Sequence, residues 1–139
     1  MKIITSPLLR FVLISAILTV LFRYVLSYGI EHQLTAVIIL AAVIYGVLLF
    51  ITGWYLGMSD AQYLPILDVG FRFHLTTYVV HVGISELWFL SGSNSSLKHI
   101  STVHLTAIIW GSFLLIHFII FMVVHKKSIR GLDRSELFE

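Results

Sequence analysis

The sequence contains no cysteine among its 139 residues. Disulfide bonds, zinc-thiolate sites, iron–sulfur clusters and thiol catalysis are therefore excluded. Charged residues are also scarce, at 12%, whereas soluble domains carry about 25%. We find no Ser–His–Asp set and no His-Glu-x-x-His motif, so the sequence gives no indication of an enzyme.

Apolar residues, in contrast, are abundant. Hydrophobic residues make up 58% of the chain and the mean hydropathy is +0.97, whereas soluble domains are about 45–50% apolar. We therefore expect an integral membrane protein with no separate soluble domain. The lipid bilayer is its first expected partner, and nucleic acid is not expected as one.

Four apolar segments are long enough to cross a bilayer as helices, which takes about 20 residues. They span residues 8–28, 34–57, 71–90 and 100–124. The expected fold is all-α, a polytopic membrane protein with four transmembrane helices as two antiparallel hairpins in one bundle. The hairpins cover residues 8–57 and 71–125, with a connector at 58–70 and a basic tail at 126–139.

Lysine and arginine are distributed unevenly between the two ends of these helices. With four spans, Arg23 and Lys98 belong to the side that holds the two turns. The side that holds both termini collects the other basic residues, which are Lys2, Arg10, Arg72, Lys126, Lys127, Arg130 and Arg134. Because cytoplasmic loops carry an excess of positive charge, we expect both termini in the cytoplasm.

The third apolar segment carries more polar groups than a membrane helix usually does. At 100° per residue, several of its side chains fall within one stripe. They are His74, Thr77, Tyr78, His81, Ser85 and Trp88. Lipid does not solvate such a stripe, so we expect it to face other helices or a water-filled cavity.

The short turn between the third and fourth segments predicts which residues lie at the same depth. In an antiparallel hairpin the numbers of facing residues add to a constant, which is near 191 for a turn centred near residue 95. This register pairs His74 with His117 and His81 with Trp110. Together with Tyr78, these residues are the candidates for binding a ligand or cofactor.

A second polar layer is expected nearer the turn. The same register places Glu86 beside His104. A carboxylate within the apolar zone needs a partner or a proton, and Arg23 is the other cationic residue at that depth. We expect Arg23, Glu86 and His104 to join the first, third and fourth helices, or to form part of a proton or ion path.

Small residues predict where helices approach each other closely. In the second segment they recur along one side, and Gly53 with Gly57 forms a GxxxG pair, a packing device in membranes. The predicted packing positions are Ala42, Gly46, Gly53, Gly57 and Gly111.

Residues 69–125 resemble the two-transmembrane (2TM) domain family of bacterial proteins. The shared pattern opens with an aromatic-x-x-His-Leu-x-x-Tyr-Val-Val run and ends with a Trp-Gly…Leu-x-x-His run. Here these residues are Phe71, His74, Leu75, Tyr78, Val79, Val80, Trp110, Gly111, Leu114 and His117. The resemblance implies a hairpin in the bacterial inner membrane, with functional weight on His74, Tyr78, Trp110 and His117. It implies no reaction.

The sequence departs from the family pattern by adding His81, Glu86 and His104, and by placing another hairpin before the matching one. That earlier hairpin is interpreted as a degenerate second copy, at about residues 8–57. Residues 44–51 align with 109–116, and Arg10-Phe11 aligns with Arg72-Phe73.

Three functions remain open at this stage. The first is a non-catalytic sensing, scaffold or assembly module with a His/Tyr/Trp network in the membrane, which responds to pH or to a lipophilic ligand. The second is haem b binding or electron transfer, with His74 and His117 as axial iron ligands. The third is an oligomeric proton or ion channel or transporter. Each of these allows a second copy of the chain or another membrane protein as partner.

Overall fold

The computed structural model describes residues 4–62, 66–93 and 100–130. These residues form four helices and no strand, which confirms the all-α prediction: α1 (Ser6–Glu31), α2 (Thr35–Asp60), α3 (Ile66–Leu90) and α4 (Ile100–Arg130). Three stretches are long and apolar enough to cross a membrane, namely Ser6–Glu31, Thr35–Asp60 and Ile100–Val123. The membrane crossing of α3 stays a prediction.

The helices are longer than the apolar segments that predict them. Helical structure enters the connector 58–70 from both sides, because α2 continues to Asp60 and α3 begins at Ile66. Helix α4 continues to Arg130, within the stretch predicted as a basic tail at 126–139. The middle of the connector, 63–65, and the end of the tail, 131–139, lie outside the described residues.

Helix α1 begins and ends with recognisable caps. The Thr5 side chain accepts a hydrogen bond from the Leu8 amide, and Pro7 occupies the first turn, where its missing N–H costs nothing. At the other end Gln33 adopts a left-handed φ of 54°, and the Leu34 amide donates to the Gly29 carbonyl at 2.8 Å. This turn sends α2 directly back along α1.

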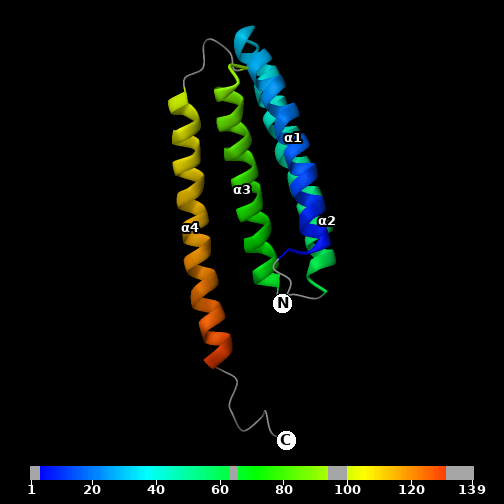
Figure 1. The fold of residues 1–139 in the computed structure, drawn as a ribbon, viewed down its shortest axis with the longest axis vertical. Helices are drawn as coiled ribbons and strands as arrows, with labels where there is room; N and C mark the ends of the chain where they lie inside the picture. The colour runs from blue at the N-terminus through cyan, green and yellow to red at the C-terminus, as the bar shows by residue number, and fades with distance from the viewer. Residues whose placement is uncertain (1–3, 63–65, 94–99, 131–139) are drawn as a thin grey trace, which may run out of the picture.

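Helix α3 lies between α4 and the α1–α2 pair (Figure 1). Its backbone lies close to those of α1, α2 and α4, whereas the α4 backbone lies close to that of α3 alone among the described helices. Figure 1 shows that α1 and α3 run in the same direction, with α4 antiparallel to both.

The core lies toward the end of the molecule where α1 starts and α2 finishes. Phe11 on α1 packs against Phe73 on α3, with ring centres 4.8 Å apart. Leu8, Leu56 and Val69 complete this buried cluster. Gly57 has no side chain and so leaves room for Val69. A Cβ added to Gly57 would lie 3.4 Å from Val69 Cγ1.

Most other large apolar side chains point away from the protein. Leu21, Phe50 and Phe113, for example, are each more than half exposed. In water such a surface promotes association or aggregation, whereas lipid solvates it. The outer faces of the helices therefore agree with a membrane environment.

Candidate functional site

A chain of hydrogen bonds joins the first three helices at mid-height. The Tyr45 hydroxyl on α2 lies 2.9 Å from Thr19 Oγ1 on α1 and 2.9 Å from His81 Nδ1 on α3. Thr19 in turn donates to the Ser15 carbonyl at 2.7 Å. Thr19 is fully buried and His81 is 8% exposed, so these bonds lie inside the protein.

Ring contacts extend this chain to the fourth helix. The His81 ring lies 5.2 Å from the Trp110 ring on α4 and 6.2 Å from Phe22 on α1. Phe22 stacks on Tyr45 at 4.5 Å, with planes only 13° apart. The Thr19–Tyr45–His81–Trp110 network therefore has one member on each of the four helices.

The pairing of His74 with His117 follows the predicted register. Their ring centres lie 5.3 Å apart, with planes at 57°. Phe71, one turn before His74, also contacts His117, at 5.9 Å. These aromatic contacts join α3 to α4 near the end of the molecule where α3 begins.

Haem b does not fit between His74 and His117 in this arrangement. Two imidazoles on opposite faces of one iron, each with its nitrogen about 2 Å from the metal, hold their ring centres about 6 Å apart or more. A macrocycle must also pass between the rings. The two rings instead contact each other directly, at 57° and 5.3 Å.

Tyr78 lies midway between the two histidine contacts. Its hydroxyl donates to the Ala107 carbonyl at 3.2 Å, and its ring meets Trp110 edge-on at 6.2 Å. A Cβ added to Gly111 would lie 3.0 Å from the Tyr78 hydroxyl oxygen. Gly111 therefore gives Tyr78 the space to pack across α4.

The other hydroxyls of the α3 stripe bond within their own helix. Thr77 donates to the Phe73 carbonyl at 2.9 Å, and Ser85 donates to the His81 carbonyl. Trp88, in contrast, donates across helices to Ser27 Oγ on α1, at 3.2 Å. Some side chains of the stripe therefore bond to other helices, whereas the hydroxyls of Thr77 and Ser85 bond within α3.

The second polar layer is present in part. Glu86 Oε1 lies 3.2 Å from His104 Nε2, which joins α3 to α4. Arg23 is buried, at 5% exposure, and interacts electrostatically with Glu86 and Tyr45. Arg23 makes no ion pair with Glu86 within 4.0 Å in the described part of the chain, and its Nε has no hydrogen-bond partner there.

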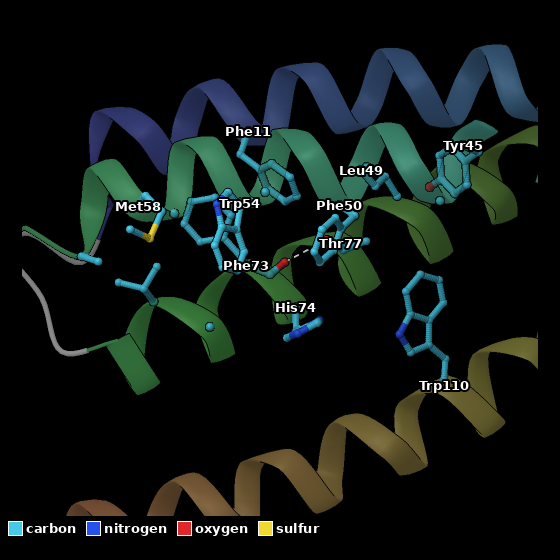
Figure 2. A pocket seen from close by; sticks show the side chains of 16 residues that line it. Phe11, Tyr45, Leu49, Phe50, Trp54, Met58, Phe73, His74, Thr77 and Trp110 are labelled. Atoms are coloured by element: carbon cyan, nitrogen blue, oxygen red, sulfur yellow. Dashed lines mark hydrogen bonds between the residues drawn. The ribbon is translucent and has the colours of Figure 1, made fainter. Parts of the chain in front are cut away.

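An apolar groove of about 690 Å³ runs between α2 and α3 and reaches α4. Figure 2 shows Phe11, Phe50, Trp54 and Phe73 along one part of it and Trp110 at the α4 side. His74 and Thr77 are its polar groups on α3. The groove is open on one side, so lipid can enter it.

The predicted packing glycines of α2 line this groove. An added Cβ at Gly53 would lie 3.5 Å from the Phe11 ring, an ordinary contact, whereas at Gly46 it would meet nothing within 4 Å. Ala42 lies beside a different cavity, together with Arg23. A role in helix packing therefore stays a prediction for Gly46 and Ala42.

Sequence reasoning placed Thr19 on a polar face of the first helix but did not single out Tyr45. Tyr45 carries the one polar side-chain group in the apolar run 36–51, and a lone hydroxyl in such a run needs a partner. That signal was available from the sequence. Asp60 was assigned to the connector, but it is buried at the end of α2 and accepts a hydrogen bond from Thr5, the residue that caps α1.

The described residues contain no group of three or more His, Asp or Glu side chains placed to hold a metal ion. No family model, curated protein or solved structure matches the chain. The resemblance to the two-transmembrane domain family therefore stays a prediction.

Proposed function

We propose that this chain is a non-catalytic membrane module that senses or holds a lipophilic molecule from the bilayer. Four membrane spans in two hairpins, with both ends on the cytoplasmic side of a bacterial inner membrane, form part of the proposal. The groove between α2 and α3 is the proposed binding site, and the Thr19–Tyr45–His81–Trp110 network holds its walls in place.

The groove is the observation that carries this proposal. Its volume of about 690 Å³ falls in the range of small-molecule sites, about 300–1,000 Å³. Aromatic and aliphatic side chains form nearly all of its lining, as Figure 2 illustrates with Phe50, Trp54 and Met58. A ligand that enters from lipid therefore needs a long apolar part.

The polar side chains in the groove restrict which kind of head group the ligand can carry. His74 and Thr77 lie on its α3 wall, and the Thr77 hydroxyl already donates to Phe73. The His74 imidazole is more exposed and can donate or accept one hydrogen bond. A lipophilic alcohol, carbonyl compound or quinone-like molecule matches this pattern of one polar group beside an apolar wall.

Gly46 allows a direct test of the groove. Because a Cβ added to Gly46 meets nothing within 4 Å, the side chain of Gly46→Phe should extend into the groove. The probe is a long-chain fatty alcohol with a diazirine, photolysed with the full-length protein in nanodiscs. We expect saturable labelling of α2 that unlabelled alcohol competes away, and roughly tenfold weaker labelling of Gly46→Phe, as for a loss of about 1.4 kcal/mol.

Val47→Phe is the matched control, since Val47 is the next residue along α2 and half exposed, at 50%. It should label like the wild type. Labelling that never saturates, or that both variants weaken equally, contradicts a specific site. A change in oligomeric state confined to Gly46→Phe indicates instead that a second copy of the chain occupies the groove.

A further inference from the structure

A second cavity, of about 300 Å³, lies where all four helices come together, on the turn side of Tyr45. Phe22 and Leu26 of α1 and Val103 of α4 form apolar parts of its wall. The polar and aromatic residues around it are Arg23, Tyr45, His81, Thr102, Thr106 and Trp110. This cavity differs from the groove in having a cationic side chain in its wall.

Arg23 is that cation, and among the described residues its charge has no partner within ion-pair distance. The residue is 5% exposed, and its Nε is fully buried without a hydrogen-bond partner in the described part of the chain. Glu86 interacts with it electrostatically, but the Glu86 carboxylate lies against His104, with Oε1 3.2 Å from Nε2. A guanidinium left this way within the membrane zone is costly and usually functional.

We propose that the cavity binds an anionic oxygen group, a phosphate or a carboxylate, with Arg23 as its anchoring cation. The planar guanidinium presents donors that match either group in a forked geometry. Thr102 supplies a hydroxyl group from the α4 side of the cavity, where Thr106 also lies. The anion is the head group of a lipid or a free ion in solution, since both present the same oxygens to Arg23.

The hydroxyl groups of Tyr45 and Thr106 at the cavity are already engaged. Tyr45 is bonded to Thr19 and His81, and Thr106 donates to the Thr102 carbonyl at 2.8 Å. Glu86 repels an anion, but its carboxylate lies 3.2 Å from His104 and is not within ion-pair distance of Arg23 in the described part of the chain. An incoming anion should therefore change the hydrogen bonding of Arg23 more than that of the other groups at the cavity.

The test follows the Arg23 Nε–H signal by ¹⁵N NMR, together with the melting temperature of the full-length protein. One arm adds inorganic phosphate to protein in neutral detergent, and the other compares nanodiscs of phosphatidylglycerol with nanodiscs of phosphatidylcholine. We expect a saturable shift of the Nε–H signal and a rise in Tm on the order of 5 °C in at least one arm. The arm that responds identifies the source of the anion.

Two variants separate binding from structure. Arg10→Gln, at an exposed position of the same helix, should keep the full response, whereas Arg23→Gln should lose the rise in Tm. No response in either arm overturns the proposal, as does an equal loss of Tm in Arg23→Gln and Glu86→Gln without any dependence on anion. The inference does not rest on the groove, and Gly46→Phe should leave the anion response unchanged.

Discussion

The hydrogen bonds around Tyr45 define which nitrogen of His81 carries the proton. A carbonyl oxygen only accepts, so Thr19 must donate its single hydroxyl proton to Ser15. Thr19 therefore accepts from Tyr45, and Tyr45 accepts from Nδ1–H of His81. Each group donates once, and the chain runs in one direction from α3 through α2 to α1.

Removal of the Tyr45 hydroxyl should weaken the packing of these helices. In Tyr45→Phe the buried Nδ1–H of His81 loses its acceptor, which costs about 1–3 kcal/mol for an unsatisfied buried group. We expect the free energy of unfolding in mixed micelles, followed by circular dichroism, to fall by about that amount. Tyr24→Phe is the matched control, because Tyr24 is 66% exposed on α1 and its removal should change the value little.

The ¹⁵N spectrum of His81 checks the direction of the chain independently of stability. In the wild type we expect the neutral tautomer with the proton on Nδ1. A neutral His81 protonated on Nε2 contradicts the proposed direction, even if Tyr45→Phe is unstable.

Pairs between α3 and α4 could be predicted at this scale, whereas the pair of Tyr45 with His81, between α2 and α3, was not predicted. His74 with His117 and Glu86 with His104 follow from the numbering alone, because a short turn fixes the register of two helices. The sequence placed a connector at 58–70, which is too long to fix a register for Tyr45. In the structure only residues 61–65 join α2 to α3, and Tyr45 and His81 are equally distant in number from the centre of that connection. Their contact could therefore be predicted only once the ends of α2 and α3 were known.

At the scale of elements, Gly29 marks a close approach of α1 and α2 near their turn. A Cβ added there would lie 2.9 Å from Ile38 Cγ1 on α2, closer than such atoms pack. Gly29→Ala should therefore push the two helices apart and reduce the free energy of unfolding by about 1–3 kcal/mol. Denaturation in mixed micelles measures the change.

Gly83→Ala is the control for this effect. Gly83 lies within α3, and a Cβ there meets nothing within 4 Å, so alanine should be neutral or stabilising by up to about 1 kcal/mol. Similar losses in both variants would show that glycine is needed for helix flexibility in general. A loss confined to Gly29→Ala would locate the close approach at the α1–α2 turn.

The existence of four helices could be predicted from hydropathy and length, but the contact of α1 with α3 could not. The side-by-side packing of α1 and α3 joins Phe11 to Phe73 and Ser27 to Trp88. The residue numbers in these pairs differ by nearly the same amount, as expected for parallel helices. Apolar faces do not specify this choice, because in lipid most apolar faces are equally well solvated.

At the scale of the whole molecule, the contact of Phe11 with Phe73 bears on the predicted duplication. The alignment of the two hairpins makes these residues equivalent, and in the structure they touch each other. Two copies related by an axis along the helices would bring equivalent positions together in this way. The duplication remains a hypothesis, because the α2 backbone lies close to those of α1 and α3, whereas the α4 backbone lies close to that of α3 alone among the described helices.

The natural lack of cysteine makes the membrane topology directly testable. Single cysteines at exposed positions at the helix ends report which side of the membrane each end faces. The four substitutions are Gln33→Cys, Ser93→Cys, Ser6→Cys and Gln62→Cys. With four spans, an impermeant maleimide should label residues 33 and 93 in intact cells, and residues 6 and 62 only in inverted membrane vesicles.

The comparison of Gln62→Cys with Ser93→Cys decides the role of α3. These positions flank α3, the helix whose membrane crossing rests on prediction because its polar groups lower its hydropathy. If α3 crosses the membrane, the two cysteines label from opposite sides. Labelling of both from the same side would leave three spans, and His74, Tyr78 and His81 would then belong to a helix lying against the membrane-spanning ones. The proposed lipid-filled groove requires the first result, because lipid reaches the wall formed by α3 only if that helix lies within the bilayer.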